Sequence, residues 1–239
     1  MIGFYDAISH EDFEKVKHMV NENHEIVHIK WLLGLTPLDY AIRFGTLDIV
    51  QFLWKMGSRP NLDAYDHGIN TPAHHIKDVA IPKWVFTEGV LPLRVLKIKN
   101  EIGWTPLDRA IACGKPEIAN YLWEIGGRSN LEGCYNSPVH HAIRYRHTET
   151  LKWAFKNKVF PLRVLNAKDC NGRTPLDIIM SQKEWETAAF LQHHLFNPVF
   201  LAMQLAKHDY QCVLRRLPNE LLDMVVDKVA AHFHLKVVW

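Results

Sequence analysis

The sequence predicts an all-α solenoid, a stack of similar helical units, because several patterns return at one fixed spacing. The tetrapeptide Thr-Pro-Leu-Asp occurs three times, 69 residues apart, at 36–39, 105–108 and 174–177. A glycine stands two residues before each copy: Gly34, Gly103 and Gly172. Other segments keep the same offset: 53–54 with 122–123, 83–86 with 152–155, and 92–96 with 161–165. Such self-similarity indicates units that bury their apolar faces against their neighbours.

The structural unit is half of this period. Further Thr-Pro and Ser-Pro pairs occur midway, at 71–72 and 137–138, so the steps between successive pairs are 35, 34, 32 and 37 residues. A unit of about 33 residues that starts with Thr-Pro resembles the ankyrin repeat, whose signature is Thr-Pro-Leu-His followed by alanine and glycines.

The resemblance is closest in the second and fourth repeats and covers roughly residues 1–195. The second repeat supplies these matching positions: Gly34, 36–39, Ala41, Gly45, Val50, Leu53, Gly57 and Asn61. The fourth supplies these: Gly103, 105–108, Ala110, Gly114, Ile118, Leu122, Gly126 and Asn130. The resemblance implies an ankyrin-repeat solenoid of about six repeats, with approximate boundaries at 1–30, 31–64, 65–99, 100–132, 133–168 and 169–195. A helical C-terminal segment is expected at 196–239.

Each position of the repeat has a physical role. Threonine followed by proline opens a helix, because the hydroxyl caps free backbone amides and proline at the first helical position gives up no hydrogen bond. In the second repeat, Leu38, Ala41 and Ile42 then fall on one helix face. We expect Gly45 to end this helix in a left-handed conformation. A second apolar helix follows over 47–53, antiparallel to the first.

Some repeats depart from the signature. Three carry aspartate where the family usually has histidine: Asp39, Asp108 and Asp177. Either side chain can bond backbone groups across the turn, so we expect this variation to be tolerated. In the third repeat Pro82 lies near the start of the second helix, and 90–93 and 159–162 replace the usual turn in the third and fifth repeats. We expect longer or irregular outer helices there.

The first repeat lacks the Thr-Pro motif. Its apolar residues still keep roughly helical spacing: Phe4, Ala7, Ile8, Phe13, Val16 and Met19. The charged residues between them predict an N-terminal capping unit with a polar outer face.

Composition excludes several functional classes. The net charge of +2 is spread along the chain, without the basic clusters of a nucleic-acid-binding protein. No stretch approaches the roughly 18 apolar residues of a membrane span, and the N-terminus shows no secretory signal. The four cysteines are scattered, which is typical of a reducing compartment. We therefore expect a cytoplasmic protein, in the host cytosol if it comes from a virus or another pathogen.

The 15 histidines do not predict a metal site. Pairs such as His74-His75 and His140-His141 point about 100° apart on a helix, and His24 and His28, four residues apart, lack a neighbouring cysteine or glutamate. No phosphate-binding glycine loop or hydrolase motif is present. We expect no catalytic residue, no cofactor and no metal.

Aromatic and arginine side chains predict a partner-binding surface. The tryptophans that recur inside helical segments, Trp54, Trp84, Trp123 and Trp153, are expected to pack between repeats. Other such residues lie at the turn tips or off the apolar face of the first helices, which line the concave surface of ankyrin-like stacks. Tryptophan, tyrosine and arginine anchor interfaces, although scattered surface aromatics are also common. The predicted strip consists of Trp31, Tyr40, Arg43, Phe44, Tyr65, His67, Trp104, Arg109, Tyr135, Arg144, Tyr145 and Arg173.

The C-terminal segment has two interpretations. Leu-Pro-Asn-Glu-Leu-Leu at 217–222 resembles the opening of an F-box, a helical module that docks on the Skp adaptor of a cullin–RING ubiquitin ligase. Ankyrin repeats followed by a truncated F-box-like (PRANC-like) tail resemble poxvirus ankyrin proteins and some bacterial effectors. The residues expected to bind the adaptor are Leu217, Pro218, Leu221, Leu222 and Val225. An amphipathic helix that only caps the solenoid would give the same pattern.

The sequence thus predicts a protein–protein interaction module. The favoured function is a substrate-recognition adaptor, in which the repeats bind a target protein and the tail binds a Skp-type ligase subunit. The alternative is a stand-alone scaffold or inhibitor whose tail caps the stack.

Overall fold

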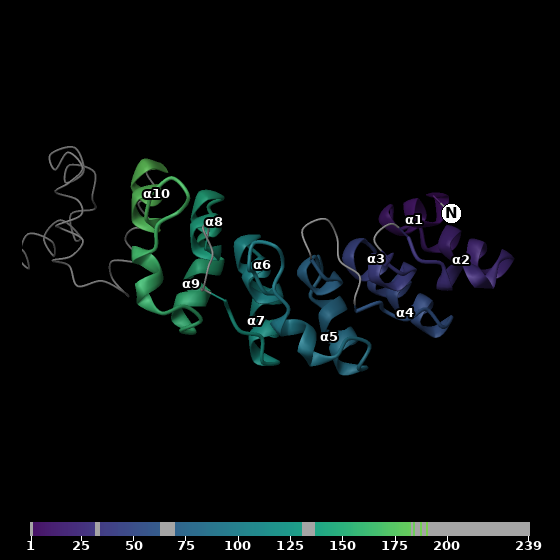
Figure 1. The fold of residues 1–239 in the computed structure, drawn as a ribbon. Coiled ribbons are helices and arrows are strands. Elements are labelled where there is room, and N and C mark those ends of the chain that lie inside the picture. Colours follow the sequence, from purple (N-terminus) through teal and green to yellow (C-terminus); the bar gives the residue numbers. More distant parts are fainter. Residues whose placement is uncertain are drawn as a thin grey trace, which may run out of the picture.

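The computed structural model describes residues 2–31, 34–62, 70–130 and 137–182, together with 184, 187 and 190. Throughout these residues the secondary structure is helical, as predicted, and the helices form two rows (Figure 1). The first row contains the first helices of successive repeats: α1 (Ile2–Ser9), α3 (Pro37–Phe44), the 3-10 helix η3 (Pro72–His74), α6 (Pro106–Ala112), α8 (Pro138–Arg144) and α10 (Pro175–Gln182).

The second row contains the second helices. They are α2 (Phe13–Glu22), α4 (Leu47–Lys55), α5 (Ala80–Thr87), α7 (Pro116–Glu124) and α9 (Thr148–Lys156). Each helix packs on its partner within the repeat and on the next helix of its own row, as in the pairs α6–α7, α6–α8 and α7–α9. One apolar core runs between the rows, so every repeat buries its apolar face against its neighbours.

Thr-Pro opens the first helices as predicted. The Thr36 hydroxyl accepts a hydrogen bond from the Asp39 backbone amide at 3.2 Å, while Asp39 Oδ2 accepts from the Thr36 amide at 2.9 Å and hydroxyl at 2.8 Å. Thr105 and Asp108 repeat this reciprocal cap. In the third repeat His74 Nδ1 accepts from the Thr71 amide at 3.1 Å. Aspartate and histidine therefore fulfil the same capping role.

The expectation for Gly45 was wrong. Its φ is −89°, outside the left-handed region. Glycine is needed there because a Cβ would lie 3.0 Å from the Ala41 carbonyl oxygen and 3.4 Å from Ile8 Cγ2. The equivalent glycine of the fourth repeat, Gly114, does adopt a left-handed φ of +68°.

The irregularity of the third and fifth repeats lies partly elsewhere than predicted. Their second helices, α5 and α9, have 8 and 9 residues, no longer than α4. A 3-10 helix follows each of them, η4 (Leu93–Lys97) and η5 (Leu162–Asn166). The first repeat has the same feature in η1 (His24–His28), so a 3-10 helix follows the second helix in the first, third and fifth repeats. The first helix of the third repeat is also irregular, because η3 spans only three residues.

The four tryptophans predicted to pack between repeats lie in the second row, half-buried against the core. Two of them are covered by an arginine: the Arg59 guanidinium lies 4.0 Å from the Trp54 ring centroid, and Arg128 lies 4.4 Å from that of Trp123. The same arginines donate hydrogen bonds to the Trp54 and Trp123 carbonyl oxygens.

Candidate partner-binding surface

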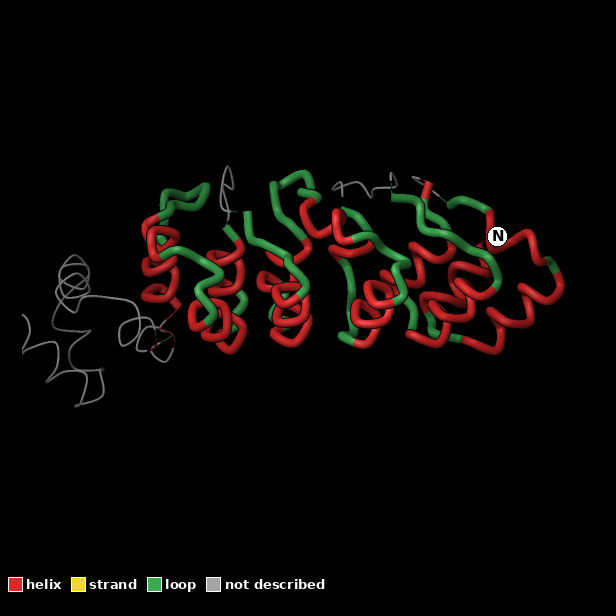
Figure 2. Tube along the Cα trace, turned by 90° about the horizontal axis from the view of Figure 1, so that it is seen from below, coloured by secondary structure: helices red, strands yellow, loops and turns green. Residues whose placement is uncertain are grey.

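Three turns of one geometry precede first helices. In each, a backbone amide bonds the carbonyl four residues later: Trp31 to Leu35 at 2.6 Å, Asn100 to Trp104 at 2.9 Å, and Asp169 to Arg173 at 2.8 Å. The glycine of each turn has a left-handed φ: +77° at Gly34, +82° at Gly103 and +74° at Gly172. Only glycine adopts this region without strain. Figure 2 shows loops along one edge of the helix rows. We call the first helices with these turns the first-helix face.

The turns are tied to the preceding or following repeat by asparagines. Asn61 Nδ2 donates to the Gly34 carbonyl at 2.9 Å, and Asn130 Nδ2 donates to the Gly103 carbonyl at 2.7 Å. The backbone amides of the same asparagines donate to Asp39 and Asp108, both at 2.9 Å. The aspartates that cap the first helices therefore also fix the chain that leads into the next repeat.

Aromatic rings gather on the face at α1 and α3. The ring centroids of Tyr5 and Trp31 are 4.5 Å apart, those of Tyr5 and Tyr40 are 5.0 Å apart, and those of Tyr40 and Phe44 are 4.7 Å apart. Tyr5 is buried, and burial raises the pKa of its hydroxyl well above the usual range, so it stays neutral. Two cations lie over the Phe44 ring: Arg43 at 4.9 Å and Lys77 at 5.7 Å from its centroid.

A second aromatic group lies at α6 and α8. The His141 ring stands edge-on to Trp104, with centroids 5.3 Å apart, and lies 4.5 Å from Tyr145. His141 Nδ1 bonds the Ala112 carbonyl oxygen at 3.0 Å, which fixes the ring. Burial lowers the pKa of His141, with Arg109 and Arg144 also lowering it. Tyr145 is 58% exposed and forms the outer side of the group.

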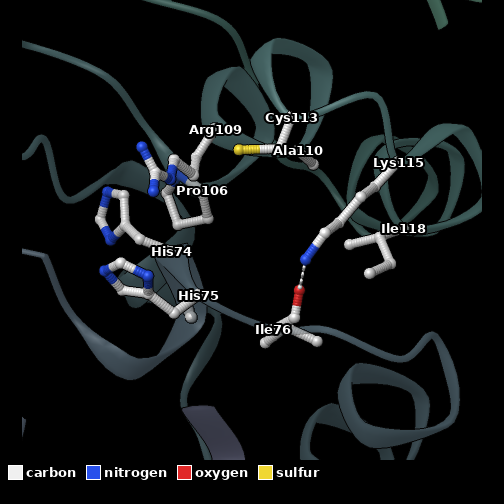
Figure 3. A pocket seen from close by; sticks show the side chains of 10 residues that line it. His74, His75, Ile76, Pro106, Arg109, Ala110, Cys113, Lys115 and Ile118 are labelled. Atoms are coloured by element: carbon white, nitrogen blue, oxygen red, sulfur yellow. Dashed lines mark hydrogen bonds between the residues drawn. The ribbon is translucent and has the colours of Figure 1, made fainter. Parts of the chain in front are cut away.

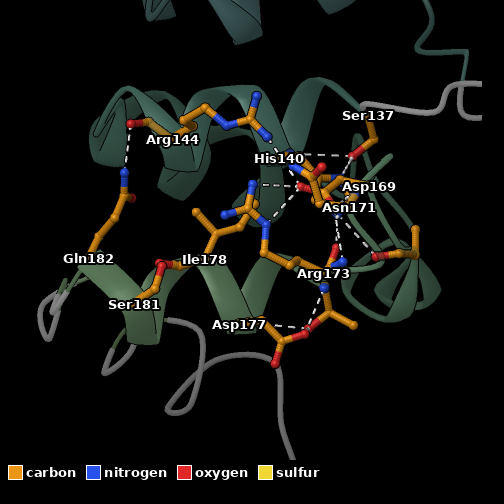
Figure 4. Close-up of polar contacts among 12 residues, drawn as sticks. Ser137, His140, Arg144, Asp169, Asn171, Arg173, Asp177, Ile178, Ser181 and Gln182 are labelled. Atoms are coloured by element: carbon orange, nitrogen blue, oxygen red, sulfur yellow. Dashed lines mark hydrogen bonds and ion pairs between the residues drawn. The ribbon is translucent and has the colours of Figure 1, made fainter.

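Beside this group two arginines converge on one buried carboxylate (Figure 4). Asp169 Oδ2 accepts from Arg144 Nη2 at 3.2 Å and from Arg173 Nη2 at 3.1 Å. Its Oδ1 accepts from the backbone amides of Asn171 and Arg173, both at 2.9 Å. Burial alone would raise the pKa of Asp169, but these amides and the Arg173 guanidinium outweigh it and hold the pKa below its usual value. Two arginines are thereby held in place beside Tyr145.

The structure distributes the predicted site residues as follows. Half-buried on the first-helix face are Trp31, Tyr40, Arg43, Phe44, Arg109, Arg144 and Arg173. Tyr145 is exposed, whereas Trp104 is only 1% exposed, so Trp104 supports this surface from inside and presents no free ring. Other predicted residues lie outside the described residues: Tyr65, His67, Tyr135, Leu217, Pro218, Leu221, Leu222 and Val225.

Sequence reasoning missed several contributors to these clusters. Tyr5, Lys77, His141 and Asp169 were not predicted to take part. For Asp169 a signal existed: it stands 69 residues after Asn100, whose Oδ1 likewise accepts from the Trp104 amide at 2.8 Å within the equivalent turn. The partners of Tyr5 and Lys77 belong to another repeat, and the period gives no information about such pairs.

Two further findings concern chemistry and membranes. Among the described residues, no three histidine, cysteine, aspartate or glutamate side chains come together as a metal-binding group. The described helices are all too short or too polar to cross a membrane.

Comparison with known proteins supports the fold. Residues 33–62 match a family model described as an ankyrin repeat. The structure is similar to the crystal structure of an ankyrin repeat domain from Acinetobacter baumannii, with a TM-score of 0.50 and 20% sequence identity. The match covers 80% of this chain and 97% of that one, which bears out the ankyrin-repeat fold. No curated protein matches the sequence.

Proposed function

We propose that the chain is a protein-binding module that recognises a partner through the first-helix face. Ankyrin repeats indicate protein–protein interaction, and the observation that carries the proposal is the group around Tyr145. This side chain is 58% exposed and leans on His141, which in turn rests on Trp104. Aromatic and arginine side chains held rigidly before binding lose little entropy when a partner docks, which is the usual composition of an interface hot spot.

Site-specific photocrosslinking in the full chain tests this proposal. A photoreactive phenylalanine analogue at position 145 should capture a protein partner that the same analogue at position 93 does not. Leu93 is the matched control because it is 57% exposed but lies on η4, outside the first helices and their turns. With the purified partner, Tyr145→Ala should weaken binding about 30-fold, the effect of a hot-spot residue, and Leu93→Ala should have no effect. Equal effects at the two positions would contradict the proposal.

The finer function we propose is that of a substrate-recognition adaptor in the cytoplasm. In it, the repeats hold a target and the segment 212–239 recruits a Skp-type subunit of a ubiquitin ligase. Its support is the sequence pattern Leu-Pro-Asn-Glu-Leu-Leu at 217–222 with apolar residues at helical spacing after it. An apolar helix face that inserts into a groove is a common mode of recognition.

A pull-down with purified Skp separates this function from that of a stand-alone scaffold or inhibitor. The full chain should bind, and the triple variant Leu217→Ala/Pro218→Ala/Leu222→Ala should not, while keeping its helical circular dichroism and melting temperature. If the wild-type chain does not bind Skp, the adaptor function is wrong. If the variant melts at a lower temperature, the tail contributes to the solenoid as a cap.

A further inference from the structure

The first row of helices has a gap at the third repeat. Between Pro72 and Trp84 this repeat has 11 residues, whereas the fifth repeat has 14 between Pro138 and Trp153. Three residues correspond to almost one helical turn. The missing turn explains why η3 ends at His74, while α8 of the fifth repeat continues to Arg144.

A small cavity lies beside this gap (Figure 3). Its volume is about 60 Å³, and it is lined by residues 73–76 at the end of η3 and by side chains of the fourth repeat: Pro106, Arg109, Ala110, Cys113, Lys115 and Ile118. An open hollow of about 450 Å³ shares Lys115 and Ile118 with it and is lined on its other side by residues 77–79. Residues 73–79, where the turn is missing, thus border both spaces.

Lys115 compensates for the missing turn. In a longer helix the Ile76 carbonyl would accept from the amide four residues later, but here it accepts from Lys115 Nζ at 2.7 Å. This bond, visible in Figure 3, holds the ammonium group at the junction of the two spaces. Burial lowers the pKa of Lys115, and the positive charges of Arg109 and Lys77 lower it further, while Cys113 raises it. Positive charge is therefore concentrated around this position.

Arg109 is the second cation of the cavity. Within the described part of the chain its guanidinium has no hydrogen bond or ion pair, unlike Arg144 and Arg173, which share Asp169. The lining of the 60 Å³ cavity contains arginine, lysine and histidine but no carboxylate. The acidic residues nearby, Asp78 and Glu117, line only the open hollow. A guanidinium without an anionic partner in a partly buried place suits an incoming anion.

We propose that this notch between η3 and α6 binds a carboxylate side chain of the protein partner, held by Arg109 and Lys115. The size fits: one water needs about 10–15 Å³ measured in this way, so the cavity holds about four water-sized groups, as many as the terminal heavy atoms of aspartate or glutamate. The proposal deepens the proposed function, on which it rests, by naming the partner's chemistry. The open hollow gives the partner's chain access to the notch.

Cys113 allows a test that needs no partner. The full chain is treated with iodoacetate, which carries a carboxylate, or with iodoacetamide, which is neutral and of similar size, and alkylation of each cysteine is measured by peptide mass spectrometry. We expect Arg109→Gln to lower the iodoacetate-to-iodoacetamide ratio at Cys113 about threefold, the effect of one unit charge about 6 Å away in water-like surroundings. The ratio at Cys170, which is exposed on a distant turn, should not change.

Arg94→Gln is the matched control, because Arg94 is an exposed arginine on η4, outside the notch. This variant should leave the ratio at Cys113 as in the wild type. Acetate should slow alkylation of Cys113 by iodoacetate more than chloride does at equal ionic strength, and this protection should vanish in Arg109→Gln. An unchanged ratio in a folded Arg109→Gln variant overturns the proposal. Stronger protection by inorganic phosphate than by acetate overturns the choice of a carboxylate.

The proposed function and this inference fail in distinguishable ways. If the alkylation results are as expected but no partner crosslinks at position 145, the notch is an anion site and the first-helix face is not the docking surface. If a partner crosslinks there but Arg109→Gln leaves the alkylation ratio unchanged, the face binds proteins and the notch takes no part.

Discussion

Asp39 and Asp108 occupy the same place in two repeats but differ in one hydrogen bond. Both are fully buried, and one oxygen of each accepts three hydrogen bonds from the chain. The other oxygen of Asp108 accepts from the Ser129 hydroxyl, whereas Pro60 stands in the place of Ser129 in the second repeat. Among the described residues, Asp39 Oδ1 is consequently buried without a hydrogen-bond partner.

Burial of Asp39 should make stability depend on pH. Burial raises its pKa to about 6, against 3.8 without the protein environment. The folded state therefore binds this proton more tightly than the unfolded state, and the free energy of unfolding should fall as the pH rises from about 4 to about 6. The fall from this group amounts to about 3 kcal/mol. Urea unfolding of Asp39→Asn between pH 4 and pH 7.5 should lack this part of the fall, because asparagine does not titrate.

Pro60→Ser provides a second test at the same carboxylate. A serine there should donate to Asp39 Oδ1 as Ser129 does to Asp108, which lowers the Asp39 pKa and makes the pH dependence shallower while the titrating group remains. The new hydrogen bond stabilises by about 1 kcal/mol, largely offset by the greater freedom of the unfolded chain without proline. If Asp39→Asn and the wild type show parallel pH curves, the charge of Asp39 is not the cause.

Single residues also show what the sequence could and could not predict. The capping aspartates were predictable, because a short carboxylate three residues after threonine has only local partners to reach. Trp104 was predicted to be exposed from its residue type and turn position, but it stands 69 residues after Leu35, which is also buried. The period indicated a core position, and residue type indicated an interface. Packing against the neighbouring repeat decided the outcome in favour of the core.

At the scale of the elements, glycines end helices for two different reasons. Gly114 and Gly89 both have a left-handed φ, of +68° and +66°. A Cβ at Gly114 would also overlap the His147 ring, whereas one at Gly89 would have nothing within 4 Å. His147 precedes α9 and stacks on Tyr145, so it is not free to move without loss.

Alanine at these two glycines should therefore have unequal effects. Gly89→Ala should lower the free energy of unfolding by about 1 kcal/mol from backbone strain alone. Gly114→Ala should cost about 2–3 kcal/mol, since overpacking adds to that strain. Chemical denaturation measures both. In a double-mutant cycle, His147→Ala should remove most of the extra cost of Gly114→Ala; an additive result would exclude the steric cause.

The boundaries of most elements followed from Thr-Pro and from the glycines, but the short η3 did not. Thr71-Pro72 looks like every other helix start, and only the number of residues between Pro72 and Trp84 reveals the missing turn. A pattern of residue types reports which helix starts, whereas its length depends on the spacing to the next element. The cavity beside η3, with Arg109 and Lys115, could not be predicted without that count.

At the scale of the whole molecule, the main helix contacts join neighbouring repeats, so stability is expected to spread along the stack from repeat to repeat. Repeats inside the stack gain from two interfaces. We expect the slowest backbone hydrogen exchange in α6, α7 and α8, and faster exchange in α1 and α2, because the N-terminal repeat has a neighbour on one side. Hydrogen-exchange mass spectrometry on the full chain checks this gradient.

Coupling between repeats can be tested at one core residue. Leu107 of α6 is 1% exposed, and Leu107→Ala should cost about 2–5 kcal/mol as a buried large-to-small substitution. Because α6 packs on both η3 and α8, exchange should become faster in peptides on both sides of the fourth repeat. An effect confined to α6 peptides would show that the repeats open independently.

The alternation of two repeat types limits how such a molecule can grow or shrink. Odd repeats end in a 3-10 helix, and even repeats end at a left-handed glycine, Gly57 or Gly126, so each junction joins unlike ends. Removing residues 36–104 would join Leu35 to Thr105 and keep the alternation, whereas removing a single repeat would bring two like ends together. The reach of the first-helix face is thus quantised: evolution or design can lengthen it only in pairs of repeats.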